Sequence, residues 1–146
     1  MKRPLRSFAL VSAQFTLLVG LALTAPWAAL GAPRIVLFVV SLLLVGWAAR
    51  ALGGRSFSVF PEPRPSARLA LNGPYRWVRH PMYLAALLAA GALGSAPPLG
   101  LHTALAVLLI PVIVAKVRVE ERALEVAFPD RSDRMRGVAR LVPGLW

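Results

Sequence analysis

The sequence predicts an all-α, polytopic membrane protein with about four transmembrane helices in a single domain, residues 1–146. Hydrophobic residues make up 58% of the chain and charged residues only 16%, whereas a soluble domain usually carries about 25% charged residues. The apolar residues gather in blocks that are long and almost free of charge, which is typical of helices that cross a bilayer. The basic residues follow the same division, because nearly all of them fall on segments that would share one side of the membrane.

Four apolar blocks define the expected spans. They cover residues 8–30, 35–52, 81–96 and 99–117. The first holds 23 residues without charge, which as a helix would be about 34 Å long and would cross a hydrocarbon core of about 30 Å. Gly53-Gly54 ends the second block. Pro97-Pro98 separates the third from the fourth, so these two predict a helical hairpin.

The start of the chain has a second interpretation. A basic leader, an apolar run and the small residues Ala29-Leu30-Gly31-Ala32 also resemble a secretory signal peptide. We expect the first block to remain as a membrane span. Cleavage would leave the orientation of the later segments unchanged.

Two long polar segments flank the predicted hairpin. The loop over residues 53–80 contains several prolines and aromatic residues. A loop of this length is usually functional or disordered, and interleaved aromatic residues favour an ordered segment at the membrane interface. The tail over residues 118–146 begins with a charged, amphipathic stretch, which predicts an amphipathic C-terminal helix.

The distribution of charge predicts the orientation. Of the 17 Lys and Arg residues, only Arg34 lies on the side opposite the N-terminus, the 53–80 loop and the tail. The positive-inside rule therefore places both termini and this loop in the cytoplasm, and an even number of spans agrees. The chain has no cysteine, which excludes disulfides and thiolate chemistry. These features are compatible with a multi-pass protein of a bacterial inner membrane.

This topology brings two distant segments together. Arg79-His80-Pro81 opens the third span, and Glu120-Glu121 follows the fourth, on the same side. From His80 to Pro97 is 17 residues and from Pro98 to Glu120 is 22, so at about 1.5 Å per residue both arms return to similar depth. A basic and aromatic cluster should therefore face the acidic pair. Its members are Tyr75, Arg76, Arg79, His80 and Tyr83.

Such a pairing suits a zwitterionic, partly aromatic ligand at the membrane surface. The first helical turn after Pro81 offers free N–H groups to a carboxylate, and Arg76 or Arg79 can add a bidentate contact. Glu120 or Glu121 can bind an ammonium group or ribose hydroxyls. The aromatic residues that can cover an adenine ring or a sulfonium are Tyr75, Trp77 and Tyr83.

The same residues carry a family resemblance. Residues 73–83 read Gly-Pro-Tyr-Arg-Trp-Val-Arg-His-Pro-Met-Tyr. They resemble the Gly-Pro-Tyr-Arg-x-x-Arg-His-Pro-x-Tyr signature of the isoprenylcysteine carboxyl methyltransferase family, whose superfamily includes membrane phospholipid methyltransferases. Glu120-Glu121-Arg122-Ala123-Leu124 resembles the second signature, Glu-Glu-x-x-Leu, and Val138-x-Arg140-x-x-Pro143 is similar to the family's C-terminal end. The resemblance covers about residues 69–143.

The resemblance implies a methyltransferase that uses S-adenosylmethionine and takes its methyl acceptor from the bilayer. It implies that His80, Pro81, Tyr83, Glu120 and Glu121 hold the cofactor. We add three residues of the two signatures to this cofactor-binding set, namely Tyr75, Arg79 and Leu124. Arg76 and Glu121 are the candidate catalytic residues, with Arg76 orienting an anionic acceptor or the cofactor carboxylate.

The chain departs from the family pattern near the end of the site. Ala85 stands where the family often has glycine, and Ser132 and Met135 stand where it often has tyrosines. The spacing to Val138 is one residue short. These departures concern the C-terminal wall and bear on the acceptor more than on the cofactor. A prenylated cysteine carboxylate, a phospholipid amine and a small thiol all remain open as acceptors.

Other interpretations compete with this one. The cluster of basic residues can be juxtamembrane cations that reach headgroups, and the acidic pair can be a solvated helix face. The main alternative function is a non-enzymatic scaffold or anionic-lipid-binding protein. A transporter would usually need charges inside its spans, and a nucleic-acid partner fits poorly because the basic residues frame apolar blocks. His80 and His102 lie far apart, so we expect no metal site.

Overall fold

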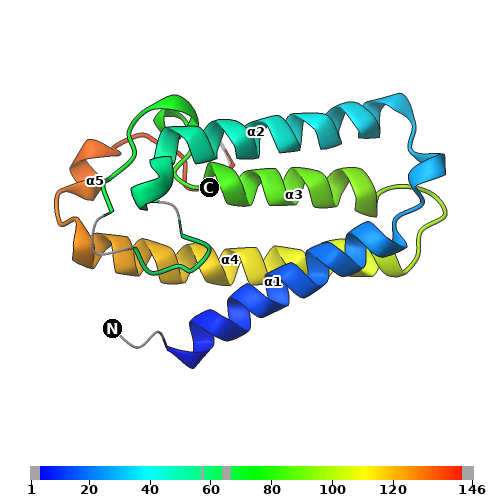
Figure 1. The fold of residues 1–146 in the computed structure, drawn as a ribbon, viewed down its shortest axis with the longest axis horizontal. Coiled ribbons are helices and arrows are strands. Elements are labelled where there is room, and N and C mark those ends of the chain that lie inside the picture. Colours follow the sequence, from blue (N-terminus) through cyan, green and yellow to red (C-terminus); the bar gives the residue numbers. More distant parts are fainter. Residues whose placement is uncertain (1–3, 57, 64–66, 143–146) are drawn as a thin grey trace.

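The computed structural model describes residues 4–56, 58–63 and 67–142. In this part the chain is helical, without a named strand, so the predicted all-α class is confirmed (Figure 1). The main helices are α1 (Leu5–Thr24), α2 (Ala32–Ser56), α3 (Pro81–Gly94) and α4 (Leu101–Ala127). Of these, α1, α2 and α4 are long and apolar enough to cross a membrane, and α3 is a shorter apolar helix.

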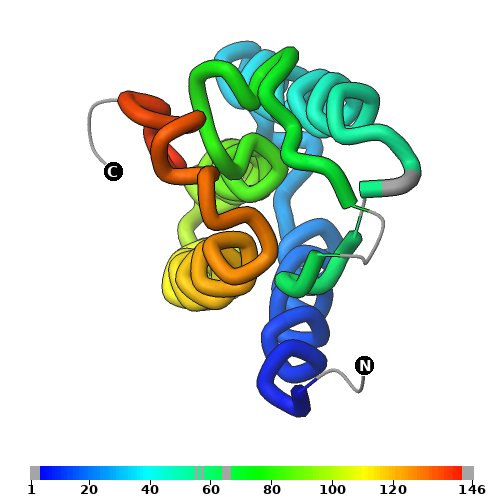
Figure 2. Tube along the Cα trace, turned by 90° about the vertical axis from the view of Figure 1, so that its left-hand side faces the viewer, coloured from blue at the N-terminus to red at the C-terminus, as the bar shows by residue number. Residues whose placement is uncertain are grey.

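The four helices pack as an open row. α2 packs on α3, α3 on α4, and α4 on α1 (Figures 1 and 2). The core between them includes three α4 side chains that are fully buried, Leu109, Ile113 and Val117, together with Leu21 of α1 and Leu93 of α3. In contrast, Leu23 on α1 is 80% exposed and Leu43 on α2 is 68% exposed. Large exposed aliphatic side chains on the outer faces fit contact with lipid.

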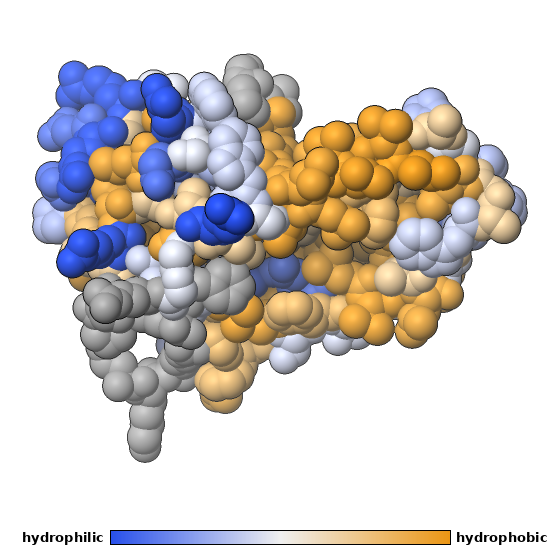
Figure 3. Space-filling view, turned by 45° about the horizontal axis from the view of Figure 1, so that its top comes forward, coloured by the Kyte–Doolittle hydropathy of each residue, from blue (hydrophilic) through white to orange (hydrophobic). Residues whose placement is uncertain are grey.

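The two ends of the row differ in polarity. At one end lie the N-terminus of α1, the end of α2, the start of α3 and the end of α4, and we call it the basic end (Figure 1). The most hydrophilic surface gathers at this end, and mostly hydrophobic surface covers the middle of the molecule (Figure 3). At the far end lie the short connections of residues 25–31 and 95–100. Arg34 is at the far end, where its Nε lies 3.4 Å from Ser95 Oγ.

The first helix is shorter than the predicted span. α1 ends at Thr24, and Ala25 is already extended, with φ −65° and ψ 137°. Pro26 explains this end, because a proline disfavours helical geometry in the residue before it. Residues 27–29 then form the 3-10 turn η1 (Trp27–Ala29). The predicted boundary at residue 30 was therefore wrong by about two helical turns.

α2 and α4 both continue beyond the spans that the sequence predicts, because polar and charged residues do not end them. α2 begins at Ala32, since Pro33 is tolerated in a first turn, and Gly53 interrupts it with φ 71° and ψ 156°. The charged stretch after residue 117 continues α4 to Ala127. The predicted amphipathic helix is thus the last part of α4, and only the short α5 (Arg131–Arg134) follows it in the described chain.

The predicted hairpin between the third and fourth spans is confirmed. Gly94 lies so close to α4 that a Cβ added there would be 2.3 Å from Cβ of Ala106. Thr103 Oγ1 donates to the carbonyl oxygen of Gly94 at 2.8 Å. His102 is buried, and its Nε2 lies 2.9 Å from the carbonyl oxygen of Ala96. His102 therefore supports the turn at the far end, away from the predicted cluster.

Candidate functional site

The first signature begins with a tight turn against α2. Gly73 has φ +56°, and a Cβ there would lie 2.9 Å from Cβ of Ala51. Only glycine combines this backbone angle with such a close approach. The 3-10 turn η2 (Gly73–Arg76) follows, and it buries Tyr75 while leaving Trp77 exposed, 5.6 Å from the ring of Trp47. The turn thus aims the Tyr75 side chain inward, at the basic end.

The C-terminal tail folds back onto the first signature. Arg79 N–H donates to the carbonyl oxygen of Ala139 at 2.8 Å, and His80 N–H donates to that of Arg140 at 3.2 Å. Val78 and Ala139 form an isolated parallel bridge. These bonds use backbone groups just before α3 begins, and they hold the tail at the basic end, against the start of α3.

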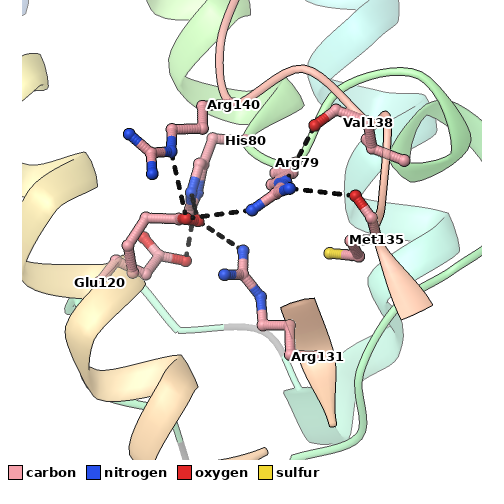
Figure 4. A network of polar contacts seen from close by, with 8 residues as sticks. Arg79, His80, Glu120, Arg131, Met135, Val138 and Arg140 are labelled. Atoms are coloured by element: carbon pink, nitrogen blue, oxygen red, sulfur yellow. Dashed lines mark hydrogen bonds and ion pairs between the residues drawn. The ribbon is translucent and has the colours of Figure 1, made fainter. Parts of the chain in front are cut away.

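Glu121 is the centre of a buried ionic cluster. Its side chain, on α4, is 9% exposed. His80 Nε2 lies 2.6 Å from Oε1, and Arg131 Nη2 donates to the same oxygen at 2.5 Å. Arg79 Nη1 lies 3.4 Å and Arg140 Nε 3.7 Å from the other oxygen. We call these five residues the Glu121 cluster. It joins the start of α3, the end of α4, α5 and the tail (Figure 4).

Arg79 and Arg131 of the Glu121 cluster are bonded differently. Arg79 donates Nε to the carbonyl oxygen of Val138 at 2.9 Å and Nη2 to that of Met135 at 3.0 Å, besides its contact with Glu121 (Figure 4). Its whole guanidinium group is therefore engaged. Arg131 is only 2% exposed, and its Nε has no hydrogen-bond partner among the described residues. Arg131 thus keeps one buried donor that this part of the chain does not satisfy.

His80 is held between two carboxylates. Its Nδ1 lies 3.7 Å from Glu120 Oε1, and its Nε2 contacts Glu121 (Figure 4). Burial by itself lowers the pKa of His80, but the hydrogen bonds and charges of Glu120 and Glu121 outweigh burial and raise this pKa above 6.5. A positively charged imidazole donates a hydrogen bond from each ring nitrogen. The raised pKa favours this protonated form of His80, which bridges the two carboxylates.

A cavity of about 410 Å³ adjoins the Glu121 cluster. At the basic end its wall includes Tyr75, His80 and Glu120, and further into the bundle it includes Tyr83 and Lys116. Burial, followed by the charge of Glu120, raises the pKa of Tyr75, so its phenol stays neutral. The cavity extends between α1 and α2, where its wall becomes aliphatic and aromatic. Among the described residues, no group of His, Asp and Glu is arranged to hold a metal ion.

Most of the predicted site residues lie on this cavity. Its wall contains seven of them, namely Tyr75, Arg79, His80, Pro81, Tyr83, Glu120 and Leu124. Glu121 lies behind the wall, where it fixes the cations of its cluster. Arg76 is exposed and is absent from the described wall of the cavity. The predicted contact between the basic and acidic segments is therefore present, while the catalytic roles assigned to Arg76 and Glu121 stay predictions.

Three residues of the site were not predicted from the sequence. Lys116, Arg131 and Met135 line the cavity and are 1%, 2% and 2% exposed. The only signal at Met135 is its departure from the family pattern, and Ser132, which departs from the same pattern, is exposed. Arg131 belongs to a polar tail that reads as solvated. Lys116 has a weak signal, because it is a cation on the apolar side of the charged end of α4. Pro143 lies outside the described residues.

The fold and the site together define a class, a helical membrane protein with a ligand-sized cavity beside a buried ionic cluster. Comparison with known families agrees with this class. The family model for phospholipid methyltransferase matches residues 15–131, which covers both signatures and most of the chain. The chain belongs to the phospholipid methyltransferase family. No curated protein and no solved structure matches it.

Proposed function

We propose that this membrane methyltransferase transfers the methyl group of S-adenosylmethionine to a membrane-partitioned acceptor, a carboxylate, a thiol or a lipid amine, at the cytoplasmic face. One observation carries the proposal. The start of α3 and the last part of α4, which are far apart in the sequence, meet at a polar wall of a cavity. This cavity continues between apolar helices. A polar ligand and an apolar one can therefore meet in a single space.

The polar part of the cavity fits the cofactor. The whole cavity, of about 410 Å³, falls within the range of small-molecule sites, about 300–1,000 Å³. Arg131 offers the unpaired Nε to a carboxylate. Glu120, whose side chain is 26% exposed, offers a carboxylate to an ammonium group or to ribose hydroxyls. Tyr75 and Tyr83 supply aromatic surface next to these charges.

The chemistry asks mainly for positioning. When bound, the cofactor supplies an activated methyl group, which is transferred by in-line displacement, so that orientation provides much of the catalysis. A carboxylate or thiolate acceptor requires no strong base. An amine acceptor must first lose a proton, and Glu120 is the wall carboxylate that lies beside His80 and the Glu121 cluster. The two carboxylates raise the pKa of His80 and favour its protonated form, which serves to hold Glu120 in place.

The test is a calorimetric titration of detergent-purified protein with S-adenosylhomocysteine. We expect saturable one-to-one binding, and we expect Glu120→Gln to raise the Kd roughly tenfold, since it removes a charged hydrogen-bond partner. Glu125→Gln is the matched control, because Glu125 is exposed on the same helix. Equal Kd values for the two variants would remove Glu120 from the site.

The same titration distinguishes the proposed methyltransferase from the alternative function. A scaffold or lipid-binding protein that acts through its basic end would bind anionic vesicles with a steep salt dependence and would show no saturable nucleoside binding. Failure of the wild-type protein to bind S-adenosylhomocysteine in several detergents and lipids would favour that function.

A further inference from the structure

Lys116 is a buried cation that the proposed cofactor site does not use. It lies one helical turn before Glu120 on α4 and is 1% exposed. Its Nζ donates to Gln14 Oε1 on α1 at 2.5 Å and to the carbonyl oxygen of Val59 at 3.2 Å. The same atom lies 5.2 Å from the ring centroid of Tyr83. Every partner is neutral, and Lys116 takes part in none of the ion pairs of the described residues.

Among the described residues, Lys116 Nζ has two hydrogen-bond acceptors and the ring of Tyr83, which leaves one N–H donor without an acceptor there. A lysine ammonium group carries three N–H donors, and two of them bind the neutral oxygens of Gln14 and Val59. A buried charge is costly unless it is paired and fully hydrogen-bonded. Lys116 lines the cavity, and a negatively charged ligand group there would satisfy its third donor best.

The position of Lys116 indicates which ligand supplies that charge. About 6 Å, the rise of one helical turn and a little more, separates Lys116 from Glu120 along α4, so Lys116 is deeper in the bundle than the polar wall. The cavity lining beyond it on α1 and α2 is mainly apolar, with Phe15, Leu18, Leu42 and Val45. Figure 3 shows hydrophilic surface set back in a hollow between hydrophobic surfaces. Lys116 thus marks the boundary between the polar and the apolar parts of the cavity.

We propose that Lys116 is the specificity-determining residue for the methyl acceptor, which binds with an anionic group, a phosphate or a carboxylate, on Nζ and with its apolar chain between α1 and α2. The proposal rests on the proposed methyltransferase function and narrows its acceptor to an anionic amphiphile. The carboxylates that line the same cavity are Glu62 and Glu120. Glu62 accepts from the hydroxyl of Ser7 through Oε1, while its Oε2 is buried without a partner among the described residues. Glu120 contacts His80, and neither carboxylate forms an ion pair with Lys116 in the described part of the chain.

The experiment compares amphiphiles of one chain length. Binding of dodecyl phosphate, laurate and the neutral dodecanol is measured by titration into the full-length protein in dodecyl maltoside micelles. We expect the wild-type protein to prefer an anionic amphiphile over dodecanol roughly tenfold or more, as for a charged hydrogen bond. Whichever of dodecyl phosphate and laurate binds more tightly identifies the acceptor's anionic group as phosphate or carboxylate.

Variants assign the preference to Lys116. Lys116→Met should abolish it, and Lys116→Gln should do the same while retaining donors for Gln14 and Val59, in case the first variant fails to fold. Lys116→Arg should keep the preference. The matched control is Arg118→Met, which removes an equal charge from an exposed position of α4 and should change nothing.

A second titration keeps this inference separate from the proposed function. Both neutral variants should bind S-adenosylhomocysteine as the wild-type protein does. If they lose it as strongly as they lose the anionic amphiphile, Lys116 serves the cofactor and the inference is overturned. Equal binding of dodecanol and the anionic amphiphiles by the wild-type protein overturns it as well. If the wild-type protein prefers an anionic amphiphile but does not bind S-adenosylhomocysteine, only the proposed function is overturned.

Discussion

The two ends of the helix row are held by different kinds of contact. At the far end, the contacts of His102 with Ala96 and of Thr103 with Gly94 join residues only 6 and 9 positions apart. At the basic end, the contacts of His80 with Glu121 and of Arg79 with Val138 join residues 41 and 59 positions apart. Apart from the exposed contact of Arg34 with Ser95, the far end uses neutral bonds to backbone oxygens, and the basic end uses buried charges.

This difference separates a turn from a site. Neutral local bonds close a hairpin and need no partner from another part of the chain. A carboxylate among several cations requires every charge to be present, because removing one leaves the others buried without compensation. The basic end therefore combines stability with ligand binding, and variants at the two ends should behave differently.

The largest effect is expected from Glu121→Gln. This change removes the negative charge that His80, Arg79 and Arg131 share, and breaking a buried ion pair in this way costs about 3–5 kcal/mol of unfolding free energy. Denaturant-induced unfolding in detergent measures the loss. Glu125→Gln, at an exposed position of the same helix, should stay within about 0.5 kcal/mol of the wild type. Equal unfolding midpoints for the two variants would contradict a stabilising role of the Glu121 cluster.

A smaller loss is expected at the far end from Gly94→Ala. The new methyl group would meet Ala106 at 2.3 Å, and overpacking of this kind costs about 1–3 kcal/mol. Gly91→Ala is the control on the same helix, because no heavy atom lies within 4 Å of its added Cβ. That control should be neutral or stabilising by up to about 1 kcal/mol. A destabilised Gly91→Ala with an unchanged Gly94→Ala would contradict the α3–α4 contact.

The charge of His80 should make stability depend on pH. Because the folded-state pKa of His80 is raised above 6.5, its contribution is complete below that value and is lost as the pH rises through the folded pKa. Each tenfold gain in the proton affinity of His80 on folding corresponds to about 1.4 kcal/mol of stability. Thermal unfolding from about pH 6 to about pH 9 should show this decline in the wild type. A His80→Gln variant with the same decline would assign it to another group.

The smallest effect is expected from Arg76→Ala. Arg76 is exposed and absent from the described cavity wall, so its removal should change the Kd for S-adenosylhomocysteine by less than about twofold, as for an exposed charge. The titration that measures Glu120→Gln also measures this variant. A tenfold loss would support the catalytic role that the sequence assigns to Arg76.

The sequence predicted which segments meet at the site better than it predicted every residue of the site. Topology alone placed His80 beside Glu120 and Glu121, since both arms of a hairpin must return to the same side. Arg131 was missed because nothing in its local sequence marks it as buried. Its burial follows from the backbone bonds that hold residues 139 and 140 beside residues 79 and 80. Arg76 and Arg79 look alike in sequence, yet only Arg79 points into the Glu121 cluster (Figure 4).

The sequence by itself determined the four helices, the hairpin and the gathering of basic residues at one end. Hydropathy, prolines and charge act locally, so that their effects are visible in single segments. The end of α1 at Thr24 and the end of α4 at Ala127 also depend on local effects of this kind. Only the tertiary structure decided which cations surround Glu121 and that Lys116 is buried inside a cavity. The local sequence does not show whether a long charged side chain reaches water, because only the packing of distant segments around it excludes the water.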